Sequence, residues 1–278
     1  MKLCQFGPPG EEKPGVVMDD GAVADLSALR GRYDPSDLSE EGLAAIAALD
    51  FDAQPRMEEG ARMGVPWTGI SKYICIGLNY ADHAREAGLD PPSEPIVFLK
   101  APSAICGPDD PTPVPVGSSK LDWEVELGVV VGSCASDVSR EDALSHVAGY
   151  CTLNDVSERA FQMATGQWDK GKGCDGFGPI GPWLVTRDEV PNPQNLALSL
   201  DVNGERMQDG NTSTMIFDVA EIISHLSRYM TLMPGDVIAT GTPPGVGMGM
   251  KPEPRFLDRG DVVTLRIEGL GEQRQRIV

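Results

Sequence analysis

Two glutamates in the segment LDWEVELGVVVG, residues 121–132, are the residues whose spacing most directly suggests chemistry. The segment alternates as a β-strand does, with large apolar side chains on one face and Glu124 and Glu126 together on the other. Such a second face is ordinarily solvated. Here it continues with small and apolar residues, which indicates a strand buried on both faces (Gly128, Val130, Gly132).

Two buried carboxylates about 6 Å apart would repel each other by roughly 3 kcal/mol at an effective dielectric of ~20. They therefore require a cation or a shifted pKa. Asp155, in CTLNDVSERAFQ, is a candidate third oxygen ligand, and three carboxylates with water suit Mg²⁺ or Mn²⁺ better than zinc. Asp155 followed by Glu158 is equally the pattern of a helix cap, and the sequence alone does not bring residues 124 and 155 together.

Two further segments carry ionisable residues with alternative interpretations. Lys172 lies between glycines in DKGKGCDGFGP, which is typical of a solvated loop but also permits close approach to an anion. His83 in NYADHAREAG lies one helical turn before Glu86, so the carboxylate can orient the imidazole, although an ordinary surface pair has the same spacing. The turn-rich segment GLDPPSEP that follows, residues 88–95, could close over a site.

The glycine-rich segment ATGTPPGVGMGM, residues 239–250, lacks the lysine and the following helix of a phosphate-binding P-loop. A Gly/Pro loop after a strand, with Thr242 and free backbone amides, could hold a carboxylate, and an ordinary tight turn is equally consistent with it.

The composition excludes several classes of function. The 278-residue chain has a net charge of -19, which disfavours nucleic acid and anionic membrane surfaces as partners. The N-terminus lacks the apolar core of a signal peptide, no apolar run approaches ~18 residues, and the six cysteines are widely spaced. These features predict a cytoplasmic protein with free thiols.

The arrangement of strand-like and helical patterns predicts a β-rich α+β fold rather than a doubly wound parallel sheet, because strands do not alternate regularly with helices. Residues 1–70 read as a small N-terminal α/β domain with an Ala/Leu-rich helix over EEGLAAIAALD, and residues 71–278 as a larger catalytic domain. Two helices are predicted in the larger unit. One lies over SREDALSHVAG, with Ser139 as its cap and Asp142 three residues further on, and the other over MIFDVAEIISHLSRYM.

Taken in order, these segments resemble the fumarylacetoacetate hydrolase family over about residues 70–270. The resemblance is to bacterial members labelled ureidoglycolate lyase or 2,4-diketo-3-deoxy sugar-acid hydrolase. It rests on these motifs: GLNYADHAREAG, PIVFLKAPSAICGP, DWEVELGVVVG, GYCTLNDVSERAFQ, GKGCDGFGPIGPWLVT, VNGERMQDGNTS and GDVIATGTPPGVG.

The resemblance implies the family's mixed β-roll and a homodimer, with a tetramer as the alternative. It implies that Mg²⁺ or Mn²⁺ is bound by Glu124, Glu126 and Asp155. It also implies a catalytic dyad of His83 and Glu86 on a mobile lid, and substrate contacts from four further side chains: Arg159, Gln162, Lys172 and Thr242. Lys172 is expected to act in catalysis as well as in binding.

The leading hypothesis on this basis is Mg²⁺-dependent hydrolysis of a C–C bond in an acylpyruvate, a 2,4-diketo acid, giving pyruvate and a carboxylic acid. Alternatives on the same oxoacid core are ureidoglycolate cleavage, oxaloacetate decarboxylation, and isomerisation or hydration of a 2-hydroxy-dienoate. A catalytically silent metal- or metabolite-binding protein is the alternative from another class. Residues that would read the far end of the substrate include Met163, Trp168 and Met248.

Overall fold

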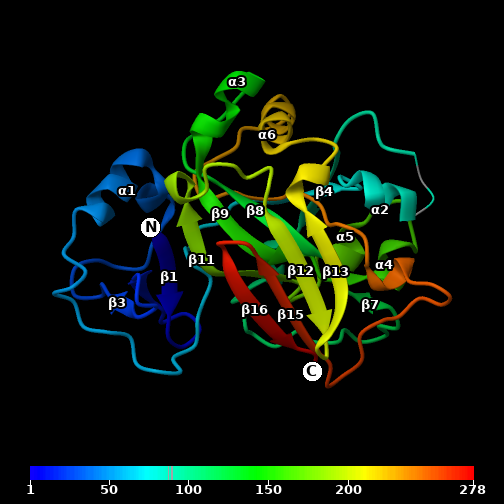
Figure 1. Ribbon diagram of the computed structural model, residues 1–278, viewed down its shortest axis with the longest axis horizontal. Helices are drawn as coiled ribbons and strands as arrows, with labels where there is room; N and C mark the ends of the chain where they lie inside the picture. Colours follow the sequence, from blue (N-terminus) through cyan, green and yellow to red (C-terminus); the bar gives the residue numbers. More distant parts are fainter. Residues whose placement is uncertain (87, 89) are drawn as a thin grey trace.

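A long mixed sheet runs through most of the protein in the computed structural model, which describes residues 1–86, 88 and 90–278 (Figure 1). Its neighbours are antiparallel except that β14 runs parallel to β4 and β6 runs parallel to β11. The strands in spatial order are β3 (Val23–Asp25), β2 (Lys13–Val17), β1 (Lys2–Phe6), β11 (Gly178–Thr186), β9 (Val147–Asn154), β8 (Val125–Val131), β14 (Val237–Ala239), β4 (Tyr73–Gly77) and β5 (Ile96–Lys100), with β6 (Ile105–Cys106) beside β11.

Two smaller antiparallel sheets accompany it. A four-stranded sheet has the order β13 (Glu205–Asn211), β12 (Ala197–Val202), β15 (Val262–Ile267) and β16 (Gly271–Arg276). A short pair joins β10 (Ser157–Glu158) to β7 (Leu121–Asp122). Because β12 and β15 pack against β8 and β9, the four-stranded sheet covers one face of the long sheet.

The helices are short, in keeping with the high glycine and proline content. The α-helices are α1 (Glu40–Ala47), α2 (Ala81–Glu86), α3 (Arg140–Ala143), α4 (Arg159–Gln162), α5 (Asp169–Lys172) and α6 (Val219–Ser227). The 3₁₀ turns are η1 (Pro35–Leu38), η2 (Pro102–Ala104), η3 (Leu144–His146), η4 (Arg187–Glu189), η5 (Thr212–Thr214) and η6 (Gly247–Gly249). The predicted cap at Ser139 is confirmed, since its side chain accepts from the amide of Asp142.

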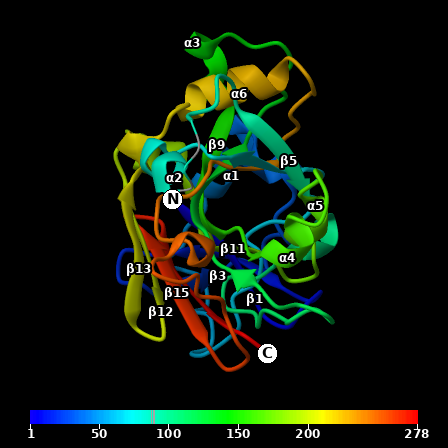
Figure 2. The same cartoon turned by 90° about the vertical axis from the view of Figure 1, so that its right-hand side faces the viewer.

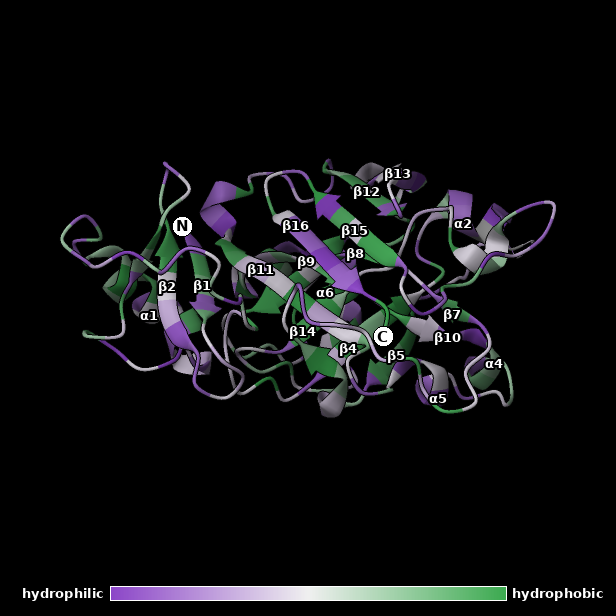
Figure 3. Ribbon diagram, turned by 90° about the horizontal axis from the view of Figure 1, so that it is seen from below, coloured by the Kyte–Doolittle hydropathy of each residue, from purple (hydrophilic) through white to green (hydrophobic). Residues whose placement is uncertain are grey.

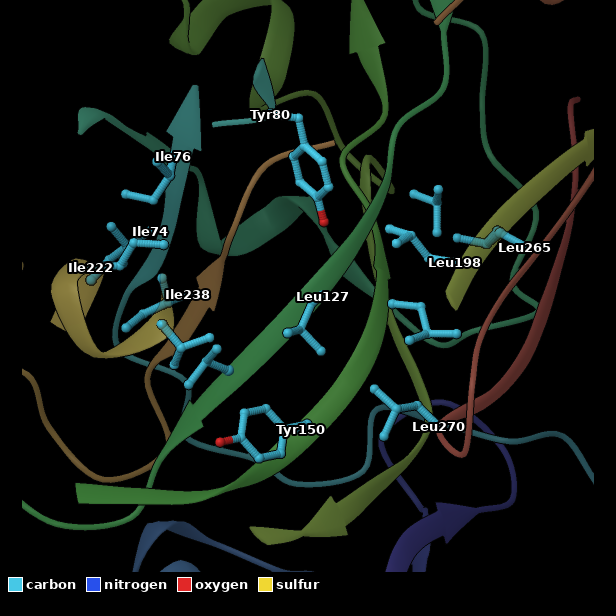
Figure 4. Packing of buried hydrophobic residues seen from close by; sticks show 14 of the residues in the cluster. Ile74, Ile76, Tyr80, Leu127, Tyr150, Leu198, Ile222, Ile238, Leu265 and Leu270 are labelled. Atoms are coloured by element: carbon cyan, nitrogen blue, oxygen red, sulfur yellow. The ribbon is translucent and has the colours of Figure 1, made fainter. Parts of the chain in front are cut away.

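The main hydrophobic core lies between the long sheet, the four-stranded sheet and α6, as Figure 4 shows. Leu127 lies among Leu198, Leu265 and Tyr150, while Ile222 of α6 packs towards Ile238. A second core covers the opposite face of the sheet with side chains from the first 70 residues. The segment that carries the two glutamates is therefore enclosed from both sides.

The structure confirms the predicted β-rich α+β class. Strands β1, β2 and β3 extend the same sheet as β8 and β9, through pairing of β1 with β11. The division at residue 70 stays a prediction. All six cysteines are free thiols. No helix among the described residues combines the length and apolar character needed to cross a membrane.

Two polar strands, β13 and β16, were not predicted from the sequence. β13 and β16 contain few apolar residues, and β16 is coloured hydrophilic along its length in Figure 3. Their glutamines are nevertheless buried, because the side-chain amides bond to neighbouring backbone and polar groups; Gln273, for example, donates to the carbonyl of Thr152 at 2.6 Å. Strands held by glutamine hydrogen bonds do not alternate apolar and polar residues, so the hydropathy pattern could not reveal β13 and β16.

Candidate active site

A cavity of about 420 Å³ opens on the side of the molecule where α2, α4 and α5 gather. Figure 2 faces this side and shows α2 on the left of the view and α4 and α5 on the right. Glu124, Glu126 and Lys172 lie in the lining and are buried, so they form its floor. His83 and Glu86 line the same cavity from α2.

Glu126 lies within β8 and Glu124 directly precedes the strand, with 2% and 6% of their surfaces exposed. Every residue of β8 is buried, which confirms the interpretation that both faces are covered. The prediction of one unbroken strand through this segment is wrong. The amide of Trp123 donates to the side chain of Asp122, and that of Glu124 to Asn154 at 3.0 Å, so side-chain oxygens replace the strand acceptors.

Asp155 follows β9 and is fully buried. The helix-cap interpretation is wrong, because α4 begins only at Arg159 and the side chain of Glu158 caps it. The amide of Asp155 instead donates to the carbonyl of Glu124 at 2.9 Å, which joins the two segments. One carboxylate oxygen from each of Glu124, Glu126 and Asp155 lies within 4.8 Å of the others.

Cationic side chains surround these carboxylates. Lys172 ends α5 and donates to Glu124 at 2.9 Å and to Asp155 at 2.6 Å, so the solvated-loop alternative is wrong. Arg159 donates to Glu124 at 2.6 Å. Lys100, a residue that the sequence analysis missed, donates to the other oxygen of Asp155.

Burial and charge act in opposite directions on these groups. Burial raises the pKa of Glu124, but the charges of Lys172 and Arg159 outweigh it and leave that pKa well below its ordinary value. Burial and the charges of Asp155 and Glu124 raise the pKa of Glu126 well above its ordinary value. Burial lowers the pKa of Lys172, while Asp155 and Glu124 more than compensate and raise it to about 12.

The three carboxylates Glu124, Glu126 and Asp155 have the chemistry that a divalent cation needs in its ligands. The amide of Gly241 donates to one oxygen of Glu126 at 2.8 Å, and its other oxygen accepts no hydrogen bond from the described residues. All three candidate ligand atoms are carboxylate oxygens, which Mg²⁺ and Mn²⁺ prefer. Within the described chain, buried carboxylates around the floor outnumber buried cations by four to three: Asp122, Glu124, Glu126 and Asp155 against Lys100, Arg159 and Lys172.

The histidine–glutamate pair lies at the rim. His83 Nδ1 is 3.0 Å from Glu86 Oε2, so the structure forms the pair that the helical spacing predicts. The amide of Gly245 donates to the other Glu86 oxygen at 3.0 Å. A side chain on Gly249 would place its Cβ 2.7 Å from the Glu86 carboxyl carbon, so glycine there leaves room for the pair. The lid prediction for residues 88–95 includes Leu89, which lies outside the described residues.

The remaining predicted contacts line the cavity as well. Gln162 accepts from Arg159 through its side-chain oxygen at 3.0 Å, which leaves its amide nitrogen available as a donor. Thr242 donates to the carbonyl of Val125 at 2.9 Å and accepts from Gln208 at 2.8 Å. The three residues expected at the far end of the substrate also line it: Met163, Trp168 and Met248.

Asp122 is a second residue that the sequence analysis missed. This buried carboxylate accepts from Arg159 Nε at 2.8 Å and from the amides of Gly247 and Met248 at 2.7 and 3.0 Å. Asp122 therefore connects the floor of the cavity to the loop that contains Gly247 and Met248. A third acidic residue so near two glutamates was a visible signal, but Arg159 and Gly247, which bond to it, lie 37 and 125 residues away in sequence.

The fold is a β-rich mixed roll, and its cavity brings carboxylates, cations and a histidine together, as an enzyme active site does. Residues 72–278 match the family described as fumarylacetoacetate (FAA) hydrolase, C-terminal. The chain belongs to the fumarylacetoacetate hydrolase family, and the predicted family and β-roll are confirmed.

Relatives cover almost the whole chain. A Burkholderia multivorans protein named provisionally as a hydrolase is 58% identical over 99% of this chain and 98% of its own length. The solved fumarylacetoacetate hydrolase from psychrophilic Exiguobacterium antarcticum has a TM-score of 0.86 and 38% identity, covering 100% of this chain and 99% of its own.

Two other solved relatives differ in the reaction that they are named for. Maleylpyruvate hydrolase from Sphingobium sp. SYK-6, in complex with manganese(II) and pyruvate, has a TM-score of 0.81 and 32% identity, covering 100% of this chain and 99% of its own. 5-Carboxymethyl-2-hydroxymuconate delta-isomerase from Mycobacterium smegmatis has a TM-score of 0.79 and 33% identity, covering 100% and 98%. The family therefore includes both hydrolases and isomerases.

Proposed function

We propose that the protein is a divalent-cation-dependent hydrolase that cleaves the C–C bond of an acylpyruvate into pyruvate and a carboxylic acid. The observation that carries this proposal is the placement of three carboxylate oxygens within 4.8 Å of one another, with two of their residues, Glu124 and Glu126, lining the same cavity as the His83–Glu86 pair. A ligand set for a hard cation and a candidate general base thus face one space. The related maleylpyruvate hydrolase, solved with manganese and pyruvate, supports the same reaction class.

Glu124, Glu126 and Asp155 would hold the cation. When bound, the cation supplies Lewis-acid stabilisation of negative charge that develops on the oxoacid oxygens. Lys172 and Thr242 would bind the substrate carboxylate. Because the Thr242 hydroxyl donates to the Val125 carbonyl, it would exchange that bond for one to the substrate.

His83 would take a proton from the water that attacks the C4 carbonyl. Its Nδ1 contacts Glu86, so the other ring nitrogen is the one available to the water. As the new C–O bond forms and C3–C4 breaks, the electron pair passes to the pyruvate half as an enolate. A proton at C3 then completes pyruvate, and the acyl half leaves as a carboxylic acid. Gln162 and Arg159 would orient the substrate from α4.

The test is product analysis with the purified protein, with and without Mg²⁺ or Mn²⁺ after chelation. The substrates are an acylpyruvate, a 2,4-diketo-3-deoxy sugar acid, oxaloacetate and ureidoglycolate. Metal-dependent release of pyruvate with an equal yield of a second carboxylic acid is the expected result. Glyoxylate from ureidoglycolate with the acylpyruvates untouched would replace the proposal with a lyase.

Isomerisation is the second candidate, supported by the related muconate isomerase. It needs a proton shuttle and no attacking water, so the same cavity could perform it. A 2-hydroxy-dienoate whose absorbance shifts without release of pyruvate, together with inert acylpyruvates, would favour this reaction.

A homodimer is proposed as the working assembly. β5 is the last strand of the long sheet, and its side chains Val97 and Leu99 are 37% and 44% exposed, so they offer an apolar surface to a second copy. Light scattering after size exclusion should give twice the chain mass. A monomeric wild type would refute the dimer.

A further inference from the structure

Three consecutive residues, Asp122, Trp123 and Glu124, lie where the floor of the cavity meets residues 245–249, here called the rim loop. Glu124 is a candidate ligand, and Asp122 accepts from two amides of the rim loop. Trp123, between them, is fully buried in the main core, and its indole Nε1 donates to the carbonyl of Gly245 at 3.0 Å. The proposed reaction assigns no role to this indole.

The rim loop in turn holds the histidine–glutamate pair. The amide of Gly245 donates to Glu86 Oε1 at 3.0 Å, and Glu86 Oε2 lies 3.0 Å from His83 Nδ1. The indole of Trp123, the backbone of Gly245, the Glu86 carboxylate and the His83 imidazole are thus linked in sequence. This chain of contacts begins at the residue directly before a candidate ligand and ends at the candidate general base.

Gly245 is suited to transmit a position along this chain. Its φ of +103° favours glycine, and a Cβ there would lie 1.9 Å from the carbonyl oxygen of Met207 in β13. On the other side, the Trp123 ring lies against the rim loop, since a Cβ on Gly247 would be 3.1 Å from Cη2 of that ring. The backbone of the rim loop is therefore held between β13 and the indole, and these contacts set where the Gly245 amide meets Glu86.

We propose that Trp123 is a positioning residue, which holds Glu86 against His83 through the Gly245 backbone and so sets the place of the general base relative to the floor. The inference rests on the proposed function, which assigns proton transfer to His83. Trp123 is not among the described residues that line the cavity. Its removal should therefore lower kcat and leave KM and metal affinity unchanged, because a misplaced base slows the reaction without changing what holds the ligands.

The experiment compares Trp123→Phe with Trp67→Phe in the Mg²⁺-loaded enzyme. Trp67 is the matched control, since it is also fully buried and its indole donates to a glycine carbonyl, that of Gly235, at 3.0 Å. Each substitution removes one buried hydrogen bond, so the two melting temperatures should fall by similar amounts. Trp123→Phe should reduce kcat about fivefold, the factor that corresponds to one neutral hydrogen bond, and Trp67→Phe should keep the wild-type kcat.

A double-mutant cycle with Glu86→Ala separates positioning from a general loss of structure. Without the Glu86 side chain, Gly245 has no carboxylate to place, so adding Trp123→Phe should cause no further loss of kcat. A fivefold loss that persists in the Glu86→Ala background overturns the inference. Equal kcat values for Trp123→Phe and Trp67→Phe overturn it as well.

Failure of the proposed function gives a different result. If wild type hydrolyses no acylpyruvate, the hydrolase proposal fails, and nuclear magnetic resonance of the ¹⁵N-labelled protein then tests the inference without turnover. The four tryptophans give four indole N–H signals, which are assigned by substituting Trp67, Trp168 and Trp183 one at a time.

Glu86→Ala should move the Trp123 signal, because the two residues share Gly245, and should leave the Trp67 signal in place. A Trp123 signal that does not move overturns the inference. Since this measurement keeps Trp123, it also decides the case in which Trp123→Phe does not fold.

Discussion

The carboxylates on the floor of the cavity and the histidine–glutamate pair at its rim differ in how many segments hold them. Glu124 is bonded to side chains from α4 and α5, and its backbone is bonded to residues at the end of β9. The pair at the rim lies on the six-residue helix α2, and Gly245 is the point at which Glu86 bonds to another segment.

This difference separates two roles within one reaction. Buried charges are tolerated only where several partners fix them, so the floor is preorganised before substrate arrives. A helix of six residues has little stability of its own, and few contacts hold α2 in register with the floor. Changes at the floor should therefore remove ligand binding and catalysis together, whereas changes at the rim should affect catalysis alone.

The largest effect is expected for Glu124→Gln. The substitution preserves volume but removes a charge from the candidate ligand set, so kcat/KM should fall about 1,000-fold, equal to roughly 4 kcal/mol of transition-state stabilisation. Calorimetric titration of Mg²⁺ or Mn²⁺ should show a parallel loss of affinity. Full metal affinity with lost turnover would place Glu124 outside the ligand set.

His83→Ala should reduce kcat about 100-fold, within the range for loss of a general base. Its affinity for Mn²⁺ should equal that of wild type, because the hydrogen bond that His83 makes within the described residues is to Glu86 rather than to a candidate ligand. Hydrolysis at the wild-type rate would eliminate the assignment of water activation to this residue.

Gly249→Ala tests the rim without removing any functional group. The new methyl would lie 2.7 Å from the Glu86 carboxyl carbon and must displace that side chain, so kcat should fall about tenfold at unchanged metal affinity. Gly31→Ala is the control, since no atom lies within 4 Å of its Cβ position. Equal activity of both variants would mean that the position of Glu86 is not critical.

The smallest effect concerns stability and the floor alone. Because the pKa of Glu126 is raised, the folded chelated protein keeps a proton that the unfolded chain releases. Its stability should therefore fall as pH rises above about 4.5, the ordinary carboxyl pKa. Chelated Glu126→Gln lacks this titration. At pH 8 it should melt higher than chelated wild type, by about 2–4 °C per kcal/mol of relief.

Calorimetric melting curves of the two chelated proteins between pH 5 and pH 8 provide the measurement. The gap should widen with pH and reverse when metal is added, since the variant lacks a ligand. If chelated wild type is more stable than chelated Glu126→Gln at pH 8, the neighbouring cations already neutralise the repulsion among the floor carboxylates and the prediction is wrong.

Local sequence patterns predicted much of the fold. Apolar residues on both faces of the segment around Glu126 predicted that it is buried, and the Ser139 cap was recognised because its partner is three residues away. Polar strands gave no such signal. β16 is held through glutamine side chains that reach across to β9, as with Gln273 on the Thr152 carbonyl, and such bonds leave no period in the sequence.

The site divides in the same way. Residue type and spacing raised the glutamate pair and the histidine–glutamate pair as candidates, because each depends on residues a few positions apart. The family resemblance then implied their roles and the third ligand, Asp155. The pairing of β8 with β9 sets Val125 opposite Asn154, and only this register brings Asp155 to Glu124. The sequence left Asp155 open as either a cap or a ligand, and gave no reason to single out Lys100 or Asp122. The residues that bond to them lie on distant segments of the chain. Strand pairing brings these segments together, and residue spacing in the sequence does not reveal that pairing.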